Sequence, residues 1–344
     1  MQENKTTIQS ISKKLNISTT TISRVLNGLG EKYRISDKTI ELVKATAEKL
    51  NYSPNNIAKG LRLKRSSTIG LIVPDITNTW FAQLALGIEN EARKHNYNIF
   101  LSNSNDDIKV EKKSIMLLQN WMVDGIIIAP IGLENEHLIK ASKRGTPLVL
   151  IDRFFEGIDL PYISSNDYQG SIEANQYLID NGHRRIACFQ GIVGTSPNNQ
   201  RVKGYKQALE KNKIPFDPAL VMGNNFGYNN GYICAKEVIK NLAKTNITAI
   251  FSTGNQITLG LLKAFKEDGI KIPGDISVIS FDEQKYSDLL YTPMTTVSHM
   301  NENVGDISLK MVLAQMDHKP KPKNVVLKSK LIIRDSVKDI NPGK

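Results

Sequence analysis

The sequence predicts an α/β protein with an N-terminal three-helix helix-turn-helix domain and a two-lobed body of doubly wound parallel sheets. At 344 residues the chain is too long for one ordinary domain. Residues 1–66 contain 13 Lys or Arg and 5 Asp or Glu, so they carry +8 of the total net charge of +11. From Thr68 onward, apolar runs alternate with amphipathic segments. These observations separate a small basic head from a nearly neutral α/β body. The positive charge of the head favours polyanion partners.

Three amphipathic segments predict the helical domain, which we place at residues 1–53. Thr7 and Ser18 are good N-caps for two short helices, and Ser36 is a good N-cap for a third. Asn27-Gly28 ends the second helix, because Gly favours the left-handed conformation after a helix C-terminus. Two short helices joined by a few residues form a helix-turn-helix.

The second predicted helix carries the chemistry of the head. Thr19, Thr20, Thr21 and Ser23 are poor helix formers, but their hydroxyls suit phosphates and base edges. Arg24 adds a forked donor that matches guanine O6 and N7. A packed helical domain with a Ser/Thr-rich surface is the alternative. We favour DNA binding.

The body, residues 67–340, reads as two series of strands and helices. The predicted strands are Ile69–Val73, Ile99–Leu101, Gly125–Ala129, Leu148–Ile151, Ile186–Phe189, Ala249–Ser252 and Ile276–Phe281. The predicted helices lie near 80–95, 108–121, 134–144, 168–181, 199–212, 228–243 and 256–268. We expect one lobe at about 67–163 plus 294–322, and the other at about 164–293 plus 323–340. Two such lobes in succession indicate a cleft, and ligands in these folds bind beyond the carboxyl ends of the strands.

Polar and aromatic side chains follow several of these strands. They are Asp75, Asn78, Trp80, Phe81, Asp152, Arg153, Asn255 and Asp282, and Arg201 begins the run Arg201–Tyr205 (RVKGY). Carboxylates, guanidinium groups and amides pair well with hydroxyl-rich ligands. Each residue alone could equally be a turn, cap or surface residue.

Several classes of protein lack support in the sequence. There is no apolar run of the ~20 residues that span a bilayer and no secretory signal, so we expect a cytoplasmic protein with no membrane partner. Cys188 and Cys234 read as buried thiols, and the five His residues show no metal-binding spacing, so we expect neither metal nor cofactor. No phosphate loop or nucleophile elbow occurs, and His299 with Asp282 favours hydrogen bonding in a pocket over acid–base catalysis. We expect a protein that is not an enzyme.

Motifs in register over the first 70 residues resemble those of the LacI/GalR family. Ser18–Gly28 (STTTISRVLNG) resembles the family's recognition helix, and Asn51–Asn55 (NYSPN) with Ser66–Ile72 (SSTIGLI) resembles the segments that follow it. The segment 28–36 is longer than the family's usual link to the third helix. The resemblance implies operator contacts from Thr7, Thr19, Thr20, Thr21, Ser23, Arg24, Asn27, Arg34 and Ser36.

Residues 54–66 form the expected hinge. By composition the segment could be a marginal helix or a flexible basic linker. The resemblance implies paired hinge helices that enter the minor groove, with Leu61 as an apolar wedge and contacts from Asn55, Ala58 and Arg62.

The body resembles the same family and the related periplasmic sugar-binding proteins. The resemblance rests on Pro74–Phe81 (PDITNTWF), Pro147–Arg153 (PLVLIDR), Gly182–Ile186 (GHRRI), Arg201–Tyr205 (RVKGY), Ile279–Asp282 (ISFD) and Thr295–Val297 (TTV). It implies effector contacts from Asn78, Trp80, Phe81, Asp152, Arg153, Arg201, Phe226, Asn255, Asp282 and His299. Three positions depart from the family pattern: Thr79 replaces Pro, Gln256 replaces Asp, and His299 replaces Gln.

Together these features predict a transcription regulator, most simply a repressor. As a homodimer it would bind a pseudo-palindromic DNA site, and a sugar-like effector in the cleft would control DNA affinity. A solute-binding protein of a sugar transport system would share the body but has no use for the head. A sugar- or nucleotide-acting enzyme would need a catalytic constellation that we do not find. The sequence leaves the effector's identity, and whether it promotes or prevents DNA binding, undetermined.

Overall fold

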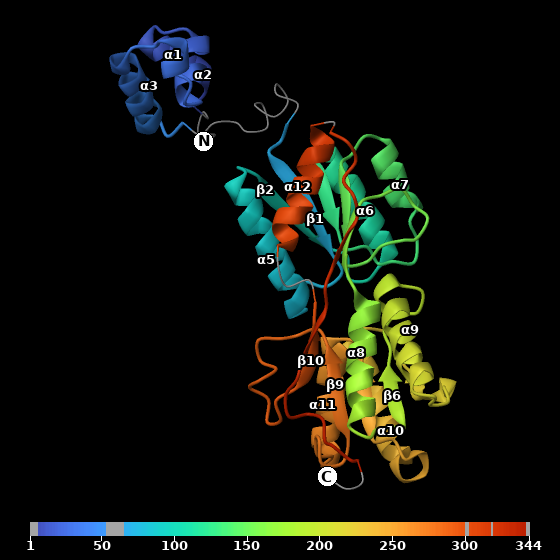
Figure 1. The fold of residues 1–344 in the computed structure, drawn as a ribbon. Helices are drawn as coiled ribbons and strands as arrows, with labels where there is room; N and C mark the ends of the chain where they lie inside the picture. Colours follow the sequence, from blue (N-terminus) through green and yellow to red (C-terminus); the bar gives the residue numbers. More distant parts are fainter. Residues whose placement is uncertain (1–5, 53–64, 300–302, 318, 342–344) are drawn as a thin grey trace. The chain divides into compact units, whose positions relative to one another are not determined.

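The computed structural model describes residues 6–52, 65–299, 303–317 and 319–341 (Figure 1). The chain divides into two units, residues 1–66 and residues 67–344, which are described separately here. Within the described segments, every helix is too short or too polar to cross a bilayer.

The described part of the N-terminal unit contains three α-helices. They are α1 (Ile8–Leu15), α2 (Thr19–Leu26) and α3 (Asp37–Lys49), with a short 3-10 helix η1 (Glu31–Tyr33) before α3. The predicted caps form, because the side chains of Thr7, Ser18 and Ser36 each accept a backbone N–H from the first turn that follows. The small core is built from Ile11, Ile22, Val25, Val43 and Ala47, which are all buried.

The first lobe of the body is a six-stranded parallel sheet in the order β11-β5-β4-β3-β1-β2. Its strands are β1 (Thr68–Val73), β2 (Asn98–Asn103), β3 (Gly125–Ile128), β4 (Leu148–Ile151), β5 (Tyr162–Ser165) and β11 (Val325–Leu327). Its helices are α5 (Thr79–Lys94), α6 (Ile108–Asn120), α7 (Glu136–Lys143) and α12 (Val304–Met316). The doubly wound parallel sheet that we predicted is confirmed.

The second lobe repeats this plan in the order β12-β10-β9-β8-β6-β7, with only β12 antiparallel to its neighbour. Its strands are β6 (Ile186–Phe189), β7 (Val221–Met222), β8 (Ala249–Ser252), β9 (Ser277–Phe281), β10 (Thr295–Ser298) and β12 (Lys330–Ile332). Its helices are α8 (Asp167–Asp180), α9 (Ser196–Lys211), η2 (Pro218–Leu220), α10 (Tyr228–Thr245) and α11 (Asn255–Asp268).

The lobe boundaries differ from the expected ones at two strands. We expected residues 294–322 in the first lobe, but β10 pairs in parallel with β9 of the second sheet. We expected residues 323–340 in the second lobe, but β11 pairs with β5 of the first sheet. The chain therefore passes between the lobes after β5, after β10 and between β11 and β12. These strands are only three or four residues long and lack the long apolar runs that marked the central strands.

The sheets are buried on both faces, which restricts where polar side chains can lie. On β1, Ile69, Leu71 and Val73 pack in one apolar cluster with α5 and α12, while Ile72 packs on the other face with α6 and α7. A parallel strand covered in this way is apolar along its length. Its accessible polar groups therefore gather just beyond its carboxyl end, where the two lobes face each other.

Candidate functional site

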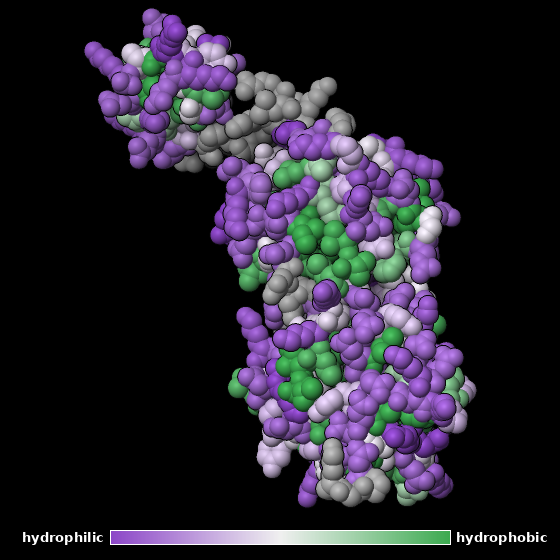
Figure 2. Space-filling model, viewed as in Figure 1, coloured by the Kyte–Doolittle hydropathy of each residue, from purple (hydrophilic) through white to green (hydrophobic). Residues whose placement is uncertain are grey.

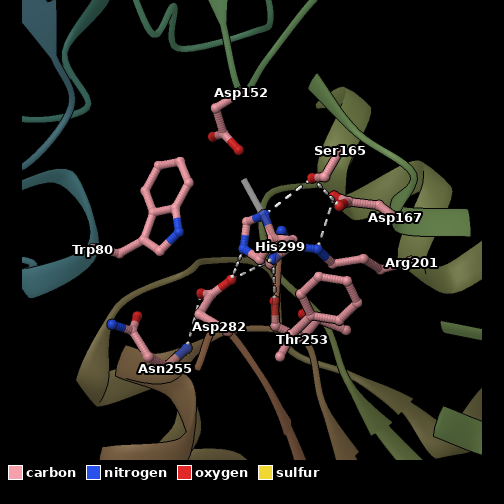
Figure 3. A network of polar contacts seen from close by, with 12 residues as sticks. Trp80, Asp152, Ser165, Asp167, Arg201, Thr253, Asn255, Asp282 and His299 are labelled. Atoms are coloured by element: carbon pink, nitrogen blue, oxygen red, sulfur yellow. Dashed lines mark hydrogen bonds and ion pairs between the residues drawn. The ribbon is translucent and has the colours of Figure 1, made fainter. Parts of the chain in front are cut away.

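All ten body residues predicted as ligand contacts line one cavity between the two lobes. The cavity is small, with a volume of about 40 Å³, and the unfilled space reaches about 400 Å³ only when the part open to solvent is included. Its lining consists of Asn78, Trp80, Phe81, Asp152, Arg153, Phe226, Arg201, Asn255, Asp282 and His299, together with Pro197 and Gly254. The polar groups approach one another from both lobes (Figure 3). Their role as ligand contacts stays a prediction.

Two aspartates occupy matching places in the two lobes. Asp152 follows β4 and Asp282 follows β9, and both have left-handed backbones, with φ of 64° and 70°. Asp tolerates this conformation better than most residues. The reversal turns each carboxylate toward the cavity beyond the strand ends (Figure 3).

Asp282 is fully engaged by the protein. Its Oδ1 lies 2.6 Å from His299 Nε2 and 3.5 Å from an Arg201 nitrogen, and its Oδ2 accepts a hydrogen bond from the backbone N–H of Asn255. Burial opposes the negative charge, but Arg201 and His299 outweigh it and hold the pKa of Asp282 below its usual value.

Asp152 is in the opposite situation. Its side chain is 8% exposed, and its nearest cation is Arg153, whose Nε lies 3.8 Å away, which is too far for a hydrogen bond. No donor among the described residues makes a hydrogen bond to this carboxylate. Burial raises its pKa from 3.8 to about 6, although Arg153 and Arg201 act against the shift. Asp152 is therefore an acceptor that the described residues leave unused.

Arg201 is held rigidly at the base of the cavity. Its Nε donates to Asp167 Oδ2 at 3.0 Å, and Nη1 donates to the backbone carbonyl of Thr253 at 2.7 Å. The guanidinium carbon lies 3.9 Å from the centroid of the Phe281 ring. Burial alone would lower the pKa of Arg201, but Asp167 and Asp282 raise it, so the side chain stays charged.

Ser165 and Asp167 are site residues that the sequence analysis missed. Ser165 Oγ donates to Asp167 Oδ1 at 2.6 Å and lies 3.0 Å from His299 Nδ1, while Asp282 holds the other ring nitrogen (Figure 3). Ser165 and Asp282 therefore contact the two ring nitrogens of His299 and fix the orientation of the ring beside Trp80.

Arg153 extends from the first lobe toward the second. Its Nη1 donates to the carbonyls of Pro130 and Ile131 and to Asp106, and its guanidinium lies 5.6 Å from the centroid of the Phe226 ring in the second lobe. Its Nε is buried and has no hydrogen-bond partner within the described part of the chain. The cavity thus contains an unused donor beside the unused acceptor of Asp152.

Aromatic rings complete the cavity. Trp80 stacks on His299 with ring centroids 5.2 Å apart and planes 14° from parallel, and the edge of Phe81 meets Trp80 at 4.8 Å. Trp80 and Phe81 lie at the start of α5, whose N-cap is Asn78. A flat apolar ring beside polar acceptors and donors is a surface that a sugar or a base can occupy.

Further hydrogen bonds join the lobes directly around the cavity. Asn255 Nδ2 donates to Asn78 Oδ1 at 2.9 Å, Thr79 Oγ1 donates to Gln284, and the backbone N–H of Phe154 donates to Ser196 Oγ at 2.9 Å. Together with the contacts of Ser165, they hold the two lobes in direct contact at the cavity.

The His299–Asp282 pair does form, but its surroundings fit binding better than catalysis. Both groups are already committed to Ser165, Arg201 and Asn255, so neither is available to move a proton to or from a substrate. In the described segments, no three His, Cys, Asp or Glu side chains form a cluster that could hold a metal ion.

The structure divides the predicted DNA-contacting residues of the head into two groups. In the first group, the polar side chains make hydrogen bonds within the domain: Thr7 and Ser36 cap helices, Thr21 pairs with Ser18, and Asn27 donates to Ser23.

In the second group, the side chains are accessible. Those of Thr19 and Thr20 are exposed and make no hydrogen bond to a described residue, and Arg34 is exposed. Arg24 stacks on Tyr33. The hinge residues Asn55, Ala58, Leu61 and Arg62 lie outside the described residues.

Known protein families match both parts of the chain. Residues 7–55 match the family described as bacterial regulatory proteins of the lacI family. Residues 66–334 match the periplasmic binding proteins and sugar binding domain of the LacI family.

Individual relatives match over nearly the full length. The transcriptional regulator DegA of Bacillus subtilis is 32% identical over 98% of this chain and 99% of its own length. The transcriptional repressor PurR of Vibrio atlanticus is 30% identical over 97% and 99%, respectively. A LacI family regulator from Enterococcus faecium, solved with bound ribose, superposes with a TM-score of 0.70 at 26% identity, over 80% of this chain and 100% of its own. These matches confirm the predicted regulator and identify no enzyme. The chain is a DNA-binding transcriptional regulator of the bacterial LacI family.

Proposed function

We propose that this regulator is a cytoplasmic repressor whose DNA affinity is set by an uncharged, hydroxyl-rich molecule bound between the lobes. One observation carries the choice of effector: among the described residues, neither the Asp152 carboxylate nor Arg153 Nε has a hydrogen-bond partner, while Arg201, Asp282 and His299 are already paired. A ligand hydroxyl can donate to Asp152, and a ring or hydroxyl oxygen can accept from Arg153. Trp80 offers its ring face to the apolar side of such a ligand.

The charges around the cavity argue against a phosphorylated effector. Arg201 faces Asp167 and Asp282, and Arg153 faces Asp106 and Asp152. Four carboxylates therefore surround two guanidinium groups, so negative groups outnumber the guanidinium groups around the cavity. A phosphate would enter a buried site without a free cation, which costs several kcal/mol in order of magnitude. The ribose-bound structure from Enterococcus faecium shows that a relative binds a neutral sugar.

The effector proposal can be tested on the full chain by ligand-dependent fluorescence and DNA binding. Trp80 lies in the cavity, so its emission should change when ribose, cellobiose or adenosine binds. Ribose 5-phosphate and glucose 6-phosphate serve as charged counterparts. We expect at least one neutral ligand to bind and to alter the affinity for a DNA site selected from a random pool. Binding of the phosphorylated sugars alone would contradict the proposal.

We further propose that α2 reads base edges and that the segment 54–66 forms the hinge. Thr19, Thr20 and Arg24 supply the polar groups on α2 that are not used up by hydrogen bonds within the head. Leu61 would act as the minor-groove wedge, by the resemblance described above. Substituting Thr20 or Arg24 should change the preferred DNA sequence, whereas a uniform loss across all sequences would contradict base reading.

We also propose a homodimer that binds a pseudo-palindromic site. Apolar side chains reach the surface of both lobes (Figure 2), and several lie on or beside β2, the edge strand of the first sheet. Leu86 of α5, Leu101 of β2, Met116 of α6 and nearby Trp121 are each 41–59% exposed. An edge strand flanked by exposed apolar side chains is a natural surface for a second copy.

Sedimentation of the full chain tests the dimer. We expect a two-chain species that Leu101→Lys converts to a monomer. Val193→Lys, at an exposed apolar residue elsewhere, should leave the dimer intact. A monomeric wild type at micromolar concentration would contradict this part of the proposal. Two recognition helices of a dimer would read half-sites about 34–36 Å apart.

A further inference from the structure

The guanidinium of Arg24 rests on the ring of Tyr33. Its central carbon lies 3.8 Å from the ring centroid, which is a close cation–π contact. Arg24 belongs to α2, and Tyr33 ends the 3-10 helix η1 in the segment between α2 and α3. That segment, residues 28–36, is longer than the link that usually joins the second and third helices in the LacI/GalR family.

The backbone that carries Tyr33 is well fixed. Its N–H donates to the carbonyls of Leu29 and Gly30 at 3.2 Å, and the N–H of Ile35 donates to the Gly30 carbonyl at 3.0 Å. Gly30 is buried against α3, where a Cβ atom would lie 2.6 Å from Ile40 Cδ1. A side chain at this position would require the Ile40 side chain to move. Tyr33 is thus a firm support for Arg24, although its own side chain is 45% exposed.

The stacked guanidinium keeps its hydrogen-bonding capacity. Its N–H groups make no hydrogen bond to any described residue, and a planar guanidinium that lies on a ring face still presents its N–H edge. A free Arg side chain must give up rotamer freedom to make a two-pronged contact with guanine. On Tyr33, part of that freedom is already lost before DNA arrives.

We propose that Tyr33 is a positioning residue for base recognition by Arg24. This inference rests on the proposed role of α2 in reading base edges. The ring holds the guanidinium in one orientation, and Arg24 makes the contact with the base. Tyr33 therefore determines how strongly the protein discriminates at the base pair that Arg24 reads, one pair in each half-site.

The test is a selection of binding sites from random DNA with the full chain and a set of variants of it. Arg24→Ala removes the reading group, Tyr33→Leu removes the ring, and Tyr33→Phe keeps it. Arg34→Asn is the matched control, because Arg34 is a neighbouring exposed cation with a left-handed backbone that Asn tolerates. Circular dichroism of each variant verifies that the helices of the head remain folded.

Arg24→Ala should abolish the preference at one base pair per half-site, with a loss of about 5- to 150-fold for the preferred sequence. Tyr33→Leu should weaken the preference at the same base pair by about two- to thirtyfold. Tyr33→Phe should retain it. Arg34→Asn should weaken all sequences alike and reduce the salt dependence of binding.

The coupling between the two residues is decisive. When Arg24 is already Ala, adding Tyr33→Leu should cost little further affinity. Equal losses from Tyr33→Leu with and without Arg24, or an unchanged motif in Tyr33→Leu, would overturn the positioning role. If Tyr33→Leu unfolds the head, Tyr33→Phe and Tyr33→His must still retain the motif, and loss of it in either would overturn the role. If the wild type selects no motif at all, the proposed DNA reading itself fails, which is a distinguishable result.

Discussion

Replacing Asp152 by Asn should stabilise the body of the ligand-free protein. The carboxylate of Asp152 is buried, accepts no hydrogen bond from a described residue, and has a pKa raised from 3.8 to about 6. At 1.36 kcal/mol per pH unit, that difference corresponds to a destabilisation of about 3 kcal/mol at neutral pH. Asn has nearly the same shape, bears no charge and tolerates the left-handed backbone at this position.

The pH dependence follows from the same shift. Below pH 3.8 the carboxyl is protonated in both the folded and the unfolded chain, so its shift has no effect on stability. Between pH 4 and 6 the unfolded chain loses the proton first, and the free energy of unfolding falls as pH rises. Above pH 6 the carboxyl is deprotonated in both states, so the free energy of unfolding falls no further. The advantage of Asp152→Asn over the wild type should therefore grow from near zero at pH 4 to about 3 kcal/mol at pH 7.

Urea unfolding of the full chain, followed by tryptophan fluorescence, measures this. The two tryptophans, Trp80 and Trp121, both lie in the body, so the signal reports on the body alone. Asp282→Asn is the matched control, because Asp282 has the same backbone conformation but forms an ion pair with Arg201 and has a pKa below its usual value. That variant should lose about 3–5 kcal/mol at pH 7.

An Asp152→Asn protein that is no more stable than the wild type at pH 7 would refute the reasoning. So would a gain that is equally large at pH 4. The variant should also bind the effector more weakly, because the amide replaces an acceptor with a mixed donor and acceptor. Retention of an unfavourable buried charge at a binding site is a recognised cost of function.

Three further predictions follow from the cavity and the hinge. Gly191→Ala should weaken effector binding about tenfold or more while the protein stays folded, as isothermal calorimetry can measure, because the added Cβ would lie 2.2 Å from the Phe226 ring. Thr79→Pro should favour an arrangement with separated lobes, measured by small-angle scattering. Position 79 begins α5, where Pro is tolerated, but the variant loses the hydrogen bond to Gln284, which contributes about 1 kcal/mol to the contact between the lobes. Unchanged scattering would contradict a role of the Thr79–Gln284 hydrogen bond in holding the lobes together. Leu61→Ala should reduce specific DNA binding far more than non-specific binding in competition assays, and equal losses would contradict the wedge.

The sequence revealed most of the cavity because the fold restricts where polar groups can go. Once the central strands were recognised by their apolar runs, residues such as Asn78, Asp152 and Asp282 had to lie just beyond them. Parallel strands bring such residues to one edge, and two lobes bring two edges together. From composition alone, each of these residues could be a turn, cap or surface residue. Phe226 and His299 were predicted only from the resemblance to the family.

The parts that sequence reasoning missed share a physical cause. Ser165 ends β5, a strand that is only four residues long and half polar, and Asp167 begins α8 just after it, so neither periodicity nor composition marked these residues. The pairing of β10 and β11 with opposite sheets depends on contacts between segments far apart in the chain. The Arg24–Tyr33 contact depends on the conformation of a turn whose residues have no regular pattern.

The central claim is that binding in the cavity between the lobes controls DNA binding by the head. The most direct test measures the affinity of the full chain for its selected DNA site, by fluorescence anisotropy, with and without a saturating neutral ligand identified by Trp80 fluorescence. We predict a change of about 5- to 150-fold, in either direction, that is reduced or lost in Asp152→Asn. An affinity that stays the same while the cavity is saturated would contradict the account.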